Sequence, residues 1–250
     1  MDSSNRSPRT LFVVSAIVVC ASIVSSAVTY AGVRVSDKLA DSGEPTRPPA
    51  VAFIGDSFTQ GHSAFPETTR WSTRVSHAQG WTELNFAHGG TSFAAKGNLP
   101  GGESFTERVP DVAAADPDLV IVATAGNYFE KQKQPQIDGT FSALQAALPD
   151  TPVIAVAPFH RRGADPIGMA AFAERVETAA TTYGACYLDP GDPLRGLGGA
   201  YFGDHIHPNA EGYAELAEAF LAAYRAEFDP AGVGALPPVG ACVSGATEQA

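Results

Sequence analysis

The chain has 250 residues, which is enough for one ordinary domain with extensions at its ends. Apolar residues make up 44% of it and charged residues 17%, a globular composition that excludes wholesale disorder. The formal net charge of −11 at pH 7 repels polyphosphates, so nucleic acid and anionic lipid are poor candidates for substrates.

An uncharged apolar stretch covers residues 11–33, behind a short basic segment, residues 1–10, that contains Arg6 and Arg9. It is long enough to cross about 30 Å of hydrocarbon as a helix. Two alternatives stay open: a membrane anchor with residues 1–10 in the cytoplasm, or a signal peptide that is cut off. Both predict that the rest of the chain is extracytoplasmic, either membrane-anchored or secreted.

The regions next to the domain ends are polar or rich in small residues. Residues 34–49 are expected to form a linker, and residues 229–250, rich in proline and glycine, a C-terminal tail. Cys186 and Cys242 remain as a pair outside the apolar stretch, and an oxidising compartment would make them a candidate disulfide. The alternative is a buried thiol at Cys186 and a free one on the tail.

Five short apolar runs lie between residues 50 and 228, the part expected to fold as one domain. Their nearly continuous apolar character is typical of strands that are buried on both faces. Stretches with helical spacing alternate with them, and this order implies parallel strands joined by right-handed crossovers. The sequence therefore predicts an α/β fold, a three-layer α/β/α sandwich with a central, mostly parallel five-stranded sheet. The expected strands cover residues 51–54, 83–87, 119–124, 153–157 and 185–188, and the expected helices residues 103–115, 136–148, 166–183 and 209–228.

Ser57 stands directly after the first expected strand, where a strand gives way to a helix. A serine at such a junction exposes its hydroxyl beside the free N–H groups of a helix N-terminus, which favour developing negative charge. Ser57 could instead merely cap the helix, since serine does this well. A phosphate-binding loop is a third alternative, but no G-x-x-x-x-G-K-[ST] pattern is present.

A serine nucleophile needs a base that takes its proton, and the histidines supply the candidates. Asp204 precedes His207 by three residues, just before the last expected helix, so its carboxylate can fold back onto the imidazole. That contact would fix the tautomer of His207 and stabilise its protonated form. His62, His77 and His160 lie in polar contexts, whereas His88 could line a pocket.

Four motifs follow one another in a characteristic order: GDSFTQG at 55–61, NFAHGG at 85–90, AGN at 125–127 and DHIHPN at 204–209. Together they resemble the SGNH/GDSL-type serine hydrolases, a family of esterases and lipases, over residues 51–213. The resemblance implies the flavodoxin-like SGNH hydrolase fold and a catalytic triad of Ser57, Asp204 and His207. It also implies an oxyanion hole formed by Ser57, Gly90 and Asn127.

Two positions depart from the family pattern. Ala125 stands where the third motif usually has glycine, and Tyr128 stands where it usually has aspartate. The oxyanion donor Asn127 is kept, so Tyr128 is expected to change the loop or narrow the acyl pocket. The implied chemistry is two-step acyl transfer through Ser57, and it requires no metal and no organic cofactor.

The sequence therefore predicts an exported or membrane-anchored serine esterase that hydrolyses O-acyl, O-acetyl or lipid esters. Its partners would be small-molecule, glycan or lipid ester substrates and, if residues 11–33 are kept, the membrane. One alternative is an O-acyltransferase acting on cell-envelope glycans, which would use the same triad. Another is a non-catalytic binding module with the same fold. The presence of all the catalytic and oxyanion positions argues against the binding module.

Overall fold

The computed structural model describes residues 47–98, 100–160 and 166–241. The basic segment 1–10, the apolar stretch 11–33 and most of the expected linker 34–49 lie outside these residues. None of the helices described is both long and apolar enough to span a bilayer.

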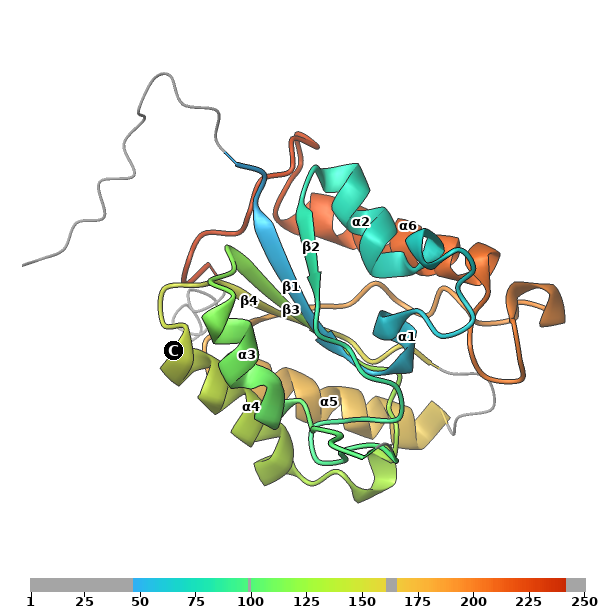
Figure 1. The fold of residues 1–250 in the computed structure, drawn as a ribbon, viewed down its shortest axis with the longest axis horizontal. Helices are drawn as coiled ribbons and strands as arrows, with labels where there is room; N and C mark the ends of the chain where they lie inside the picture. Colours follow the sequence, from blue (N-terminus) through green and yellow to red (C-terminus); the bar gives the residue numbers. More distant parts are fainter. Residues whose placement is uncertain (1–46, 99, 161–165, 242–250) are drawn as a thin grey trace, which may run out of the picture. The chain divides into compact units, whose positions relative to one another are not determined.

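A five-stranded parallel sheet forms the centre of the domain, as the sequence predicts (Figure 1). Its spatial order is β2-β1-β3-β4-β5, so β1 and β3 lie inside the sheet and β2 and β5 at its edges. The residues of β1, β3 and β4 are almost all buried, which explains why these runs are continuously apolar. The strands are β1 Ala50–Gly55, β2 Thr82–Asn85, β3 Leu119–Ala123, β4 Val153–Val156 and β5 Cys186–Leu188.

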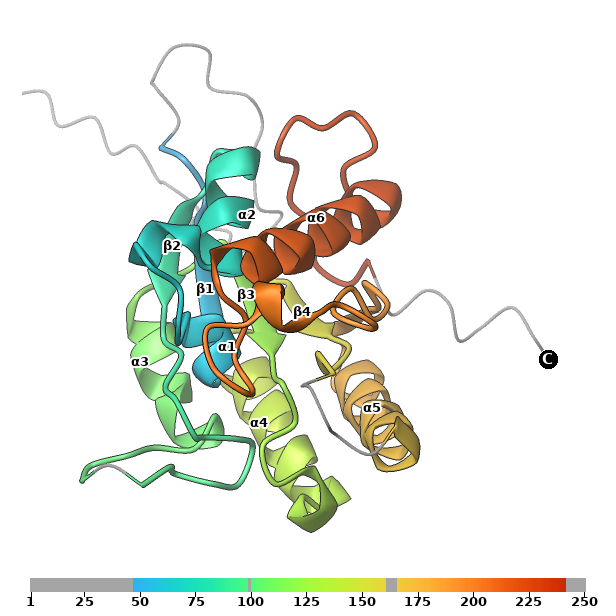
Figure 2. The same ribbon diagram turned by 90° about the vertical axis from the view of Figure 1, so that its right-hand side faces the viewer.

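Helices cover both faces of this sheet, which confirms the three-layer sandwich (Figures 1 and 2). Alternate residues of each strand point to opposite faces, and each face has its own apolar core. Phe53 packs in the core that includes Trp71 and Phe220, and Ile54 in the core that includes Phe141. The helices over the first face are α2 Trp71–Gln79 and α6 Ala210–Glu227; those over the second are α3 Val109–Ala114, α4 Gln134–Ala147 and α5 Pro166–Thr182.

The sequence did not predict α2, and it overestimated the length of α3. The segment of α2, WSTRVSHAQ, is rich in residues with modest helix propensity, and its packing against α6 stabilises it instead. The expected helix 103–115 is divided, because a 3₁₀ turn at Thr106–Arg108 precedes α3. The other three expected helices agree with α4, α5 and α6 to within a few residues.

Part of the expected tail, residues 229–241, packs against the domain. The Trp81 Nε1–H donates to the Gly234 carbonyl at 3.2 Å, and the Tyr224 hydroxyl donates to the Ala235 carbonyl at 2.7 Å. Asp229 is buried and accepts the backbone N–H groups of Val233 and Gly234. The folded part of the chain therefore continues past residue 228.

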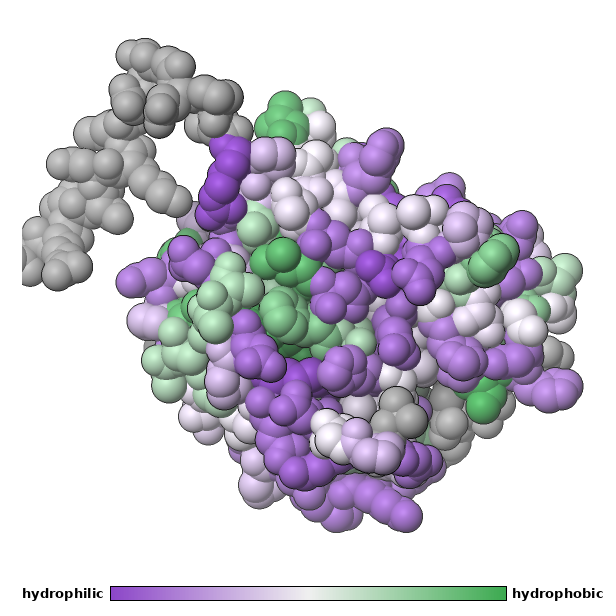
Figure 3. All heavy atoms as spheres, viewed as in Figure 1, coloured by the Kyte–Doolittle hydropathy of each residue, from purple (hydrophilic) through white to green (hydrophobic). Residues whose placement is uncertain are grey.

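The surface is polar over most of the face drawn in Figure 3. An apolar area interrupts the polar surface on this face (Figure 3). Leu84 and Phe86, in and just after the edge strand β2, are partly buried against the core. Cys186, in the edge strand β5, is disulfide-bonded. Cys242 lies outside the described residues, so its pairing with Cys186 stays a prediction.

Candidate active site

Ser57 is the first residue of the short helix α1 (Ser57–Gln60), directly after β1. Gly55 allows this sharp junction, because a Cβ there would lie 2.7 Å from the Ala123 carbonyl oxygen and 2.4 Å from Thr59. Asp56 caps α1 by accepting the Phe58 N–H at 3.0 Å. The capping role that was an alternative for Ser57 is therefore carried out by Asp56, and the Ser57 hydroxyl is available for other partners.

The Asp56 carboxylate also joins the nucleophile junction to the end of β3. Its Oδ2 accepts the Thr124 hydroxyl at 2.9 Å and the Ala125 N–H at 2.7 Å. Complete burial raises the pKa of Asp56, while these donated hydrogen bonds and the nearby His207 act in the opposite direction. Asp56 thus fixes the position of α1 relative to the loop that contains Asn127.

The structure brings Ser57, His207 and Asp204 together across 150 residues of chain. The Nε2 atom of His207 lies 2.9 Å from Ser57 Oγ, and its Nδ1 atom lies 2.8 Å from Asp204 Oδ2. Both distances are hydrogen-bond distances, and the imidazole lies between the hydroxyl and the carboxylate. This is the arrangement in which a base is oriented by a third group.

The loop that contains Asp204 and His207 is stabilised by hydrogen bonds between the Asp204 side chain and the backbone N–H groups of the same loop. Asp204 Oδ1 accepts the N–H groups of Ile206 at 2.7 Å and His207 at 2.6 Å. Desolvation acts to raise the pKa of Asp204, but the hydrogen bonds from His207 and Ile206 hold it well below its ordinary range. Asp204 therefore stays ionised at neutral pH, although 40% of its side chain is exposed.

The loops that contain the expected oxyanion donors Gly90 and Asn127 contact each other, and the first of them passes Ser57. Gly90 has a left-handed backbone with φ of 73°, which suits glycine, and the Asn127 side-chain amide donates to the Thr91 carbonyl at 3.2 Å. Among the hydrogen bonds of the described part of the chain, none has the N–H of Ser57 or of Gly90 as donor. A Cβ at Gly89 would lie 3.7 Å from Ser57 Cβ, so this loop passes directly beside the nucleophile.

Arg108 is a buried arginine that the sequence did not single out. Only 1% of it is exposed, and it lies between the nucleophile junction and the oxyanion loop. It donates to the Gly55 carbonyl at 3.0 Å, to the Thr91 hydroxyl at 2.8 Å and to the Phe86 carbonyl. Burial lowers its pKa to about 10 although Asp56 favours the charge, so the guanidinium is charged at neutral pH. The sequence gives no sign of this role, because residues 103–115 show only helical periodicity.

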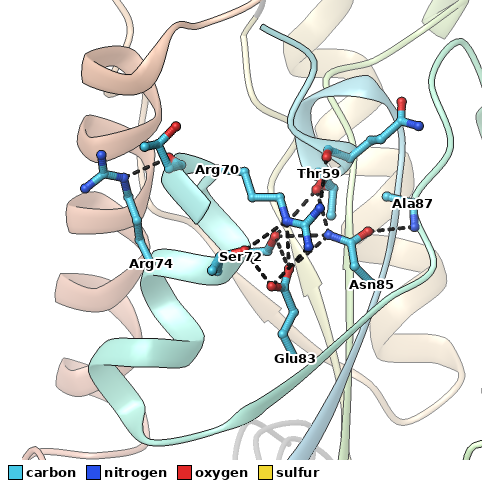
Figure 4. Close-up of polar contacts among 10 residues, drawn as sticks. Thr59, Arg70, Ser72, Arg74, Glu83, Asn85 and Ala87 are labelled. Atoms are coloured by element: carbon cyan, nitrogen blue, oxygen red, sulfur yellow. Dashed lines mark hydrogen bonds and ion pairs between the residues drawn. The ribbon is translucent and has the colours of Figure 1, made fainter. Parts of the chain in front are cut away.

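A second polar network supports α1 from the side of β2 (Figure 4). The Glu83 carboxylate accepts the Arg70 Nε–H at 3.2 Å and the Ser72 hydroxyl at 2.6 Å. Burial acts to raise the pKa of Glu83, but hydrogen bonds and the charge of Arg70 hold it below its ordinary value. The Asn85 amide donates to Glu83 and to the Thr59 carbonyl, both at 3.0 Å, and thereby joins β2 to α1.

A pocket of about 470 Å³ is lined in part by Gly89, whose backbone passes close to the Ser57 side chain in space. Polar side chains and glycines line most of it, and His88 is one of them, as the sequence suggested. Burial, and then the charge of Arg108, lower the pKa of His88 and favour its neutral form. The lining residues are Gln60, His62, His88, Gly89, Thr91, Lys96, Pro100, Gly101 and Gly102.

Tyr128 does not line this pocket. It lines a second hollow of about 320 Å³ together with Lys96, Lys131 and others. Its backbone is left-handed, with φ of 55°, and 42% of the residue is exposed. The position that departs from the usual aspartate therefore lies in a partly exposed loop next to Asn127, and its side chain is not among those that line the pocket beside Ser57.

Comparisons with known proteins agree with this description. A sequence profile of the GDSL-like lipase/acylhydrolase family matches residues 53–215. No curated protein matches the chain.

Several solved structures share the fold. A carbohydrate acetylesterase from Sinorhizobium meliloti is 18% identical, with a TM-score of 0.56 over 72% of this chain and 100% of that one. A member of the lipolytic G-D-S-L family from Veillonella parvula is 16% identical, with a TM-score of 0.54 over 70% and 97% of the two chains. A salicylyl-acyltransferase from a tetracycline biosynthetic pathway is 16% identical, with a TM-score of 0.57 over 74% and 56%.

These likenesses show the shared fold, and the profile covers most of the domain, including the segments of Ser57 and His207. The chain therefore belongs to the GDSL-like lipase/acylhydrolase family and is an ester-acting hydrolase.

Proposed function

We propose that the protein is a serine esterase that works through an acyl-enzyme on Ser57, with His207 as base and Asp204 as its orienting partner. The observation that carries this proposal is the continuous contact from Ser57 Oγ to His207 Nε2 at 2.9 Å and from His207 Nδ1 to Asp204 Oδ2 at 2.8 Å. Neither a helix cap nor a binding module requires a serine, an imidazole and a carboxylate in this arrangement.

In the first step His207 Nε2 takes the hydroxyl proton while Ser57 Oγ attacks the ester carbonyl. The developing imidazolium is stabilised by the ionised Asp204, to which Nδ1–H donates. His207 then gives its proton to the leaving alcohol oxygen, and the acyl group stays on Ser57. A water molecule, deprotonated by His207, releases the acid in the second step and restores the hydroxyl.

The negative charge on the former carbonyl oxygen would be stabilised by the N–H groups of Ser57 and Gly90 and the side-chain amide of Asn127. In the structure this amide donates to the Thr91 carbonyl at 3.2 Å, a neutral acceptor that an oxyanion would outcompete. Arg108 and Asp56 hold the backbone beside these donors, through the Gly55 carbonyl and the Ala125 N–H, so the backbone of the site is preorganised.

The pocket beside Ser57 supports small, polar esters as substrates. Among the described residues that line it, none has a large aliphatic or aromatic hydrocarbon side chain of the kind that holds a fatty acyl chain. Gln60, His88 and Lys96 offer hydrogen bonds to hydroxyl groups instead. We therefore favour O-acetylated carbohydrates, the substrate class named for the structurally similar acetylesterase, over long-chain lipid esters.

We also propose that the enzyme is exported, either anchored by residues 11–33 or secreted. The apolar stretch and the disulfide-bonded Cys186 support this location, because disulfides persist in oxidising compartments. The measurement is a non-reducing mass analysis of the native protein after thiol alkylation. A Cys186–Cys242 disulfide would leave both cysteines unalkylated, whereas alkylation of both would contradict the pairing and weaken the case for export.

A series of p-nitrophenyl esters from acetate to palmitate, assayed with the full chain, tests the activity. The Ser57→Ala variant is the matched control for background hydrolysis. We expect the highest kcat/KM for acetate and a steep fall with chain length. Preference for palmitate would contradict the proposal of a small, polar ester substrate. Wild-type rates equal to those of Ser57→Ala would contradict the proposal of a serine esterase.

The same assay separates hydrolysis from transfer to a sugar. Hydrolysis releases acetate and p-nitrophenol in equal amounts, even when a glycan is added. An acyltransferase, the activity of another structurally similar protein, would release less acetate than p-nitrophenol in the presence of its acceptor.

A further inference from the structure

His62 lies against the catalytic pair although it is 145 residues away in the sequence and has no place in the proposed mechanism. Its ring centre is 4.3 Å from that of His207, and its Nε2 is 3.8 Å from Asp204 Oδ2. One ligand atom from each of His62, Asp204 and His207 can be chosen so that all three lie within 4.8 Å of one another. Two imidazoles and one carboxylate are a donor set that zinc prefers.

We propose that His62, Asp204 and His207 form an inhibitory site for Zn²⁺ or a similar borderline transition-metal ion. With metal–ligand bonds of about 2.0–2.2 Å and tetrahedral angles, neighbouring ligand atoms lie about 3.3–3.5 Å apart. The distances to Asp204 Oδ2 are 2.8 Å from His207 Nδ1 and 3.8 Å from His62 Nε2. One must widen and the other shorten by about half an ångström. The two histidine nitrogens, whose separation is within 4.8 Å, must also come to about 3.3–3.5 Å, and rotation of the exposed His62 side chain can supply this shift.

Two of the three ligand side chains are exposed to solvent. The side chains of His62 and Asp204 are 57% and 40% exposed, whereas that of His207 is 17% exposed. His62 therefore has freedom to rotate toward Asp204, while His207 stays fixed against Ser57. A fourth ligand position would face solvent and be filled by water, as is usual for three-residue zinc sites.

Metal binding at this place would stop the reaction through the histidine tautomer. A metal on Nδ1 occupies the lone pair there, so the single proton of a neutral His207 must be on Nε2. The Nε2–H can only donate to Ser57 Oγ, and it no longer takes the hydroxyl proton. The metal also replaces the hydrogen bond by which Asp204 orients the ring. Inhibition rests on the proposed function, whereas metal binding itself does not.

The test combines calorimetry and kinetics on the full chain with Zn²⁺, and uses Mg²⁺ as the control ion. We expect one zinc ion to bind both the wild type and the inactive Ser57→Ala variant. Zinc should inhibit p-nitrophenyl acetate hydrolysis over the same concentration range in which it binds in the calorimeter. Addition of a chelator should restore the rate of hydrolysis. Mg²⁺ prefers oxygen ligands and should do neither.

His62→Asn should weaken zinc binding at least 10-fold, since it removes a direct ligand, and changes around metal ligands already cost 10–100-fold. His62→Gln serves as a second variant, and His77→Asn, an exposed histidine on α2, is the matched control and should bind as the wild type does. Each variant's rate with zinc is divided by its own rate without it. No zinc binding to the wild type, or equal binding by His62→Asn and the wild type, would overturn the site.

An enzyme that fails to hydrolyse any ester would leave the calorimetric result intact. Zinc binding by Ser57→Ala, lost in His62→Asn, would then still support the metal site while the esterase proposal fails. Hydrolysis that is insensitive to zinc, combined with zinc bound through His62, would instead contradict the inhibitory role alone.

Discussion

The two halves of the active site are stabilised in different ways. The nucleophile half, with Asp56 and Ser57, is buried and is fixed by hydrogen bonds from Arg108 and from the segment that directly follows β3. The base half, with Asp204 and His207, lies on a partly exposed loop whose contacts are mostly local. Substitutions in the buried half should therefore cost both activity and stability, whereas those in the loop should cost mainly activity.

The largest effect is expected from Ser57→Ala. Ser57 is in the buried half, but the substitution removes only a hydroxyl, and its main partner in the described structure is His207. We expect turnover to fall by on the order of 10⁴–10⁶ and the unfolding midpoint to stay within a few degrees. Retention of a tenth of the wild-type rate would show that another group is the nucleophile.

Asp204→Asn tests the exposed half. An asparagine amide cannot stabilise the imidazolium and favours the wrong tautomer of His207, so we expect turnover to fall about 10⁴-fold. The free energy of unfolding should change by less than about 1 kcal/mol, because the side chain is partly exposed and the amide oxygen can still accept the N–H of Ile206.

Asp56→Asn is the matched control for Asp204→Asn in the buried half. The Asp56 carboxylate accepts three hydrogen bonds in the interior. In asparagine an NH₂ group, which cannot accept, replaces one of the two oxygens, so at least one of these hydrogen bonds is lost. We expect a loss of about 2–4 kcal/mol in the free energy of unfolding. Equal stability losses in the two variants would refute the contrast between the two halves.

Asn127→Ala should lower turnover by about 10²–10³, which corresponds to about 2.7–4 kcal/mol of transition-state stabilisation. The effect should be on kcat rather than KM, because the amide is needed when the oxyanion forms. If only KM changed, Asn127 would position the substrate, and the oxyanion hole would need another donor.

The sequence predicted all five strands and most helices, because buried parallel strands are apolar throughout and amphipathic helices keep a clear period. The residues of the candidate site were found through motifs in chain order, so Ser57 and His207 could be paired before any distance was known. Arg108 and His62 could not be found in this way. Arg108 donates hydrogen bonds to carbonyl groups at the ends of two strands. The ring of His62 lies against His207, which is in a loop far along the chain. Such contacts depend on the fold and have no local pattern.

Arg108→Lys tests the contribution of the buried half of the active site to the free energy of unfolding. A lysine carries one point-like ammonium and cannot reach the carbonyls of Gly55 and Phe86 and the Thr91 hydroxyl together. At least one buried acceptor would lose its partner, so we expect about 1–3 kcal/mol of lost stability. Arg195→Lys, an exposed arginine paired with Asp192, is the control and should change stability by less than about 1 kcal/mol.

The smallest effect is expected from Tyr128→Asn, at the position where the chain departs from its family. Tyr128 has a left-handed backbone, which costs an ordinary residue about 1–2 kcal/mol and asparagine less. The residue is 42% exposed and lines a hollow that shares only Lys96 with the pocket beside Ser57. We therefore expect a gain in unfolding free energy of up to about 1 kcal/mol, measured by chemical denaturation, with turnover changed less than about 10-fold. A much larger loss of turnover, with stability unchanged, would mean that the tyrosine contacts the substrate or fixes Asn127.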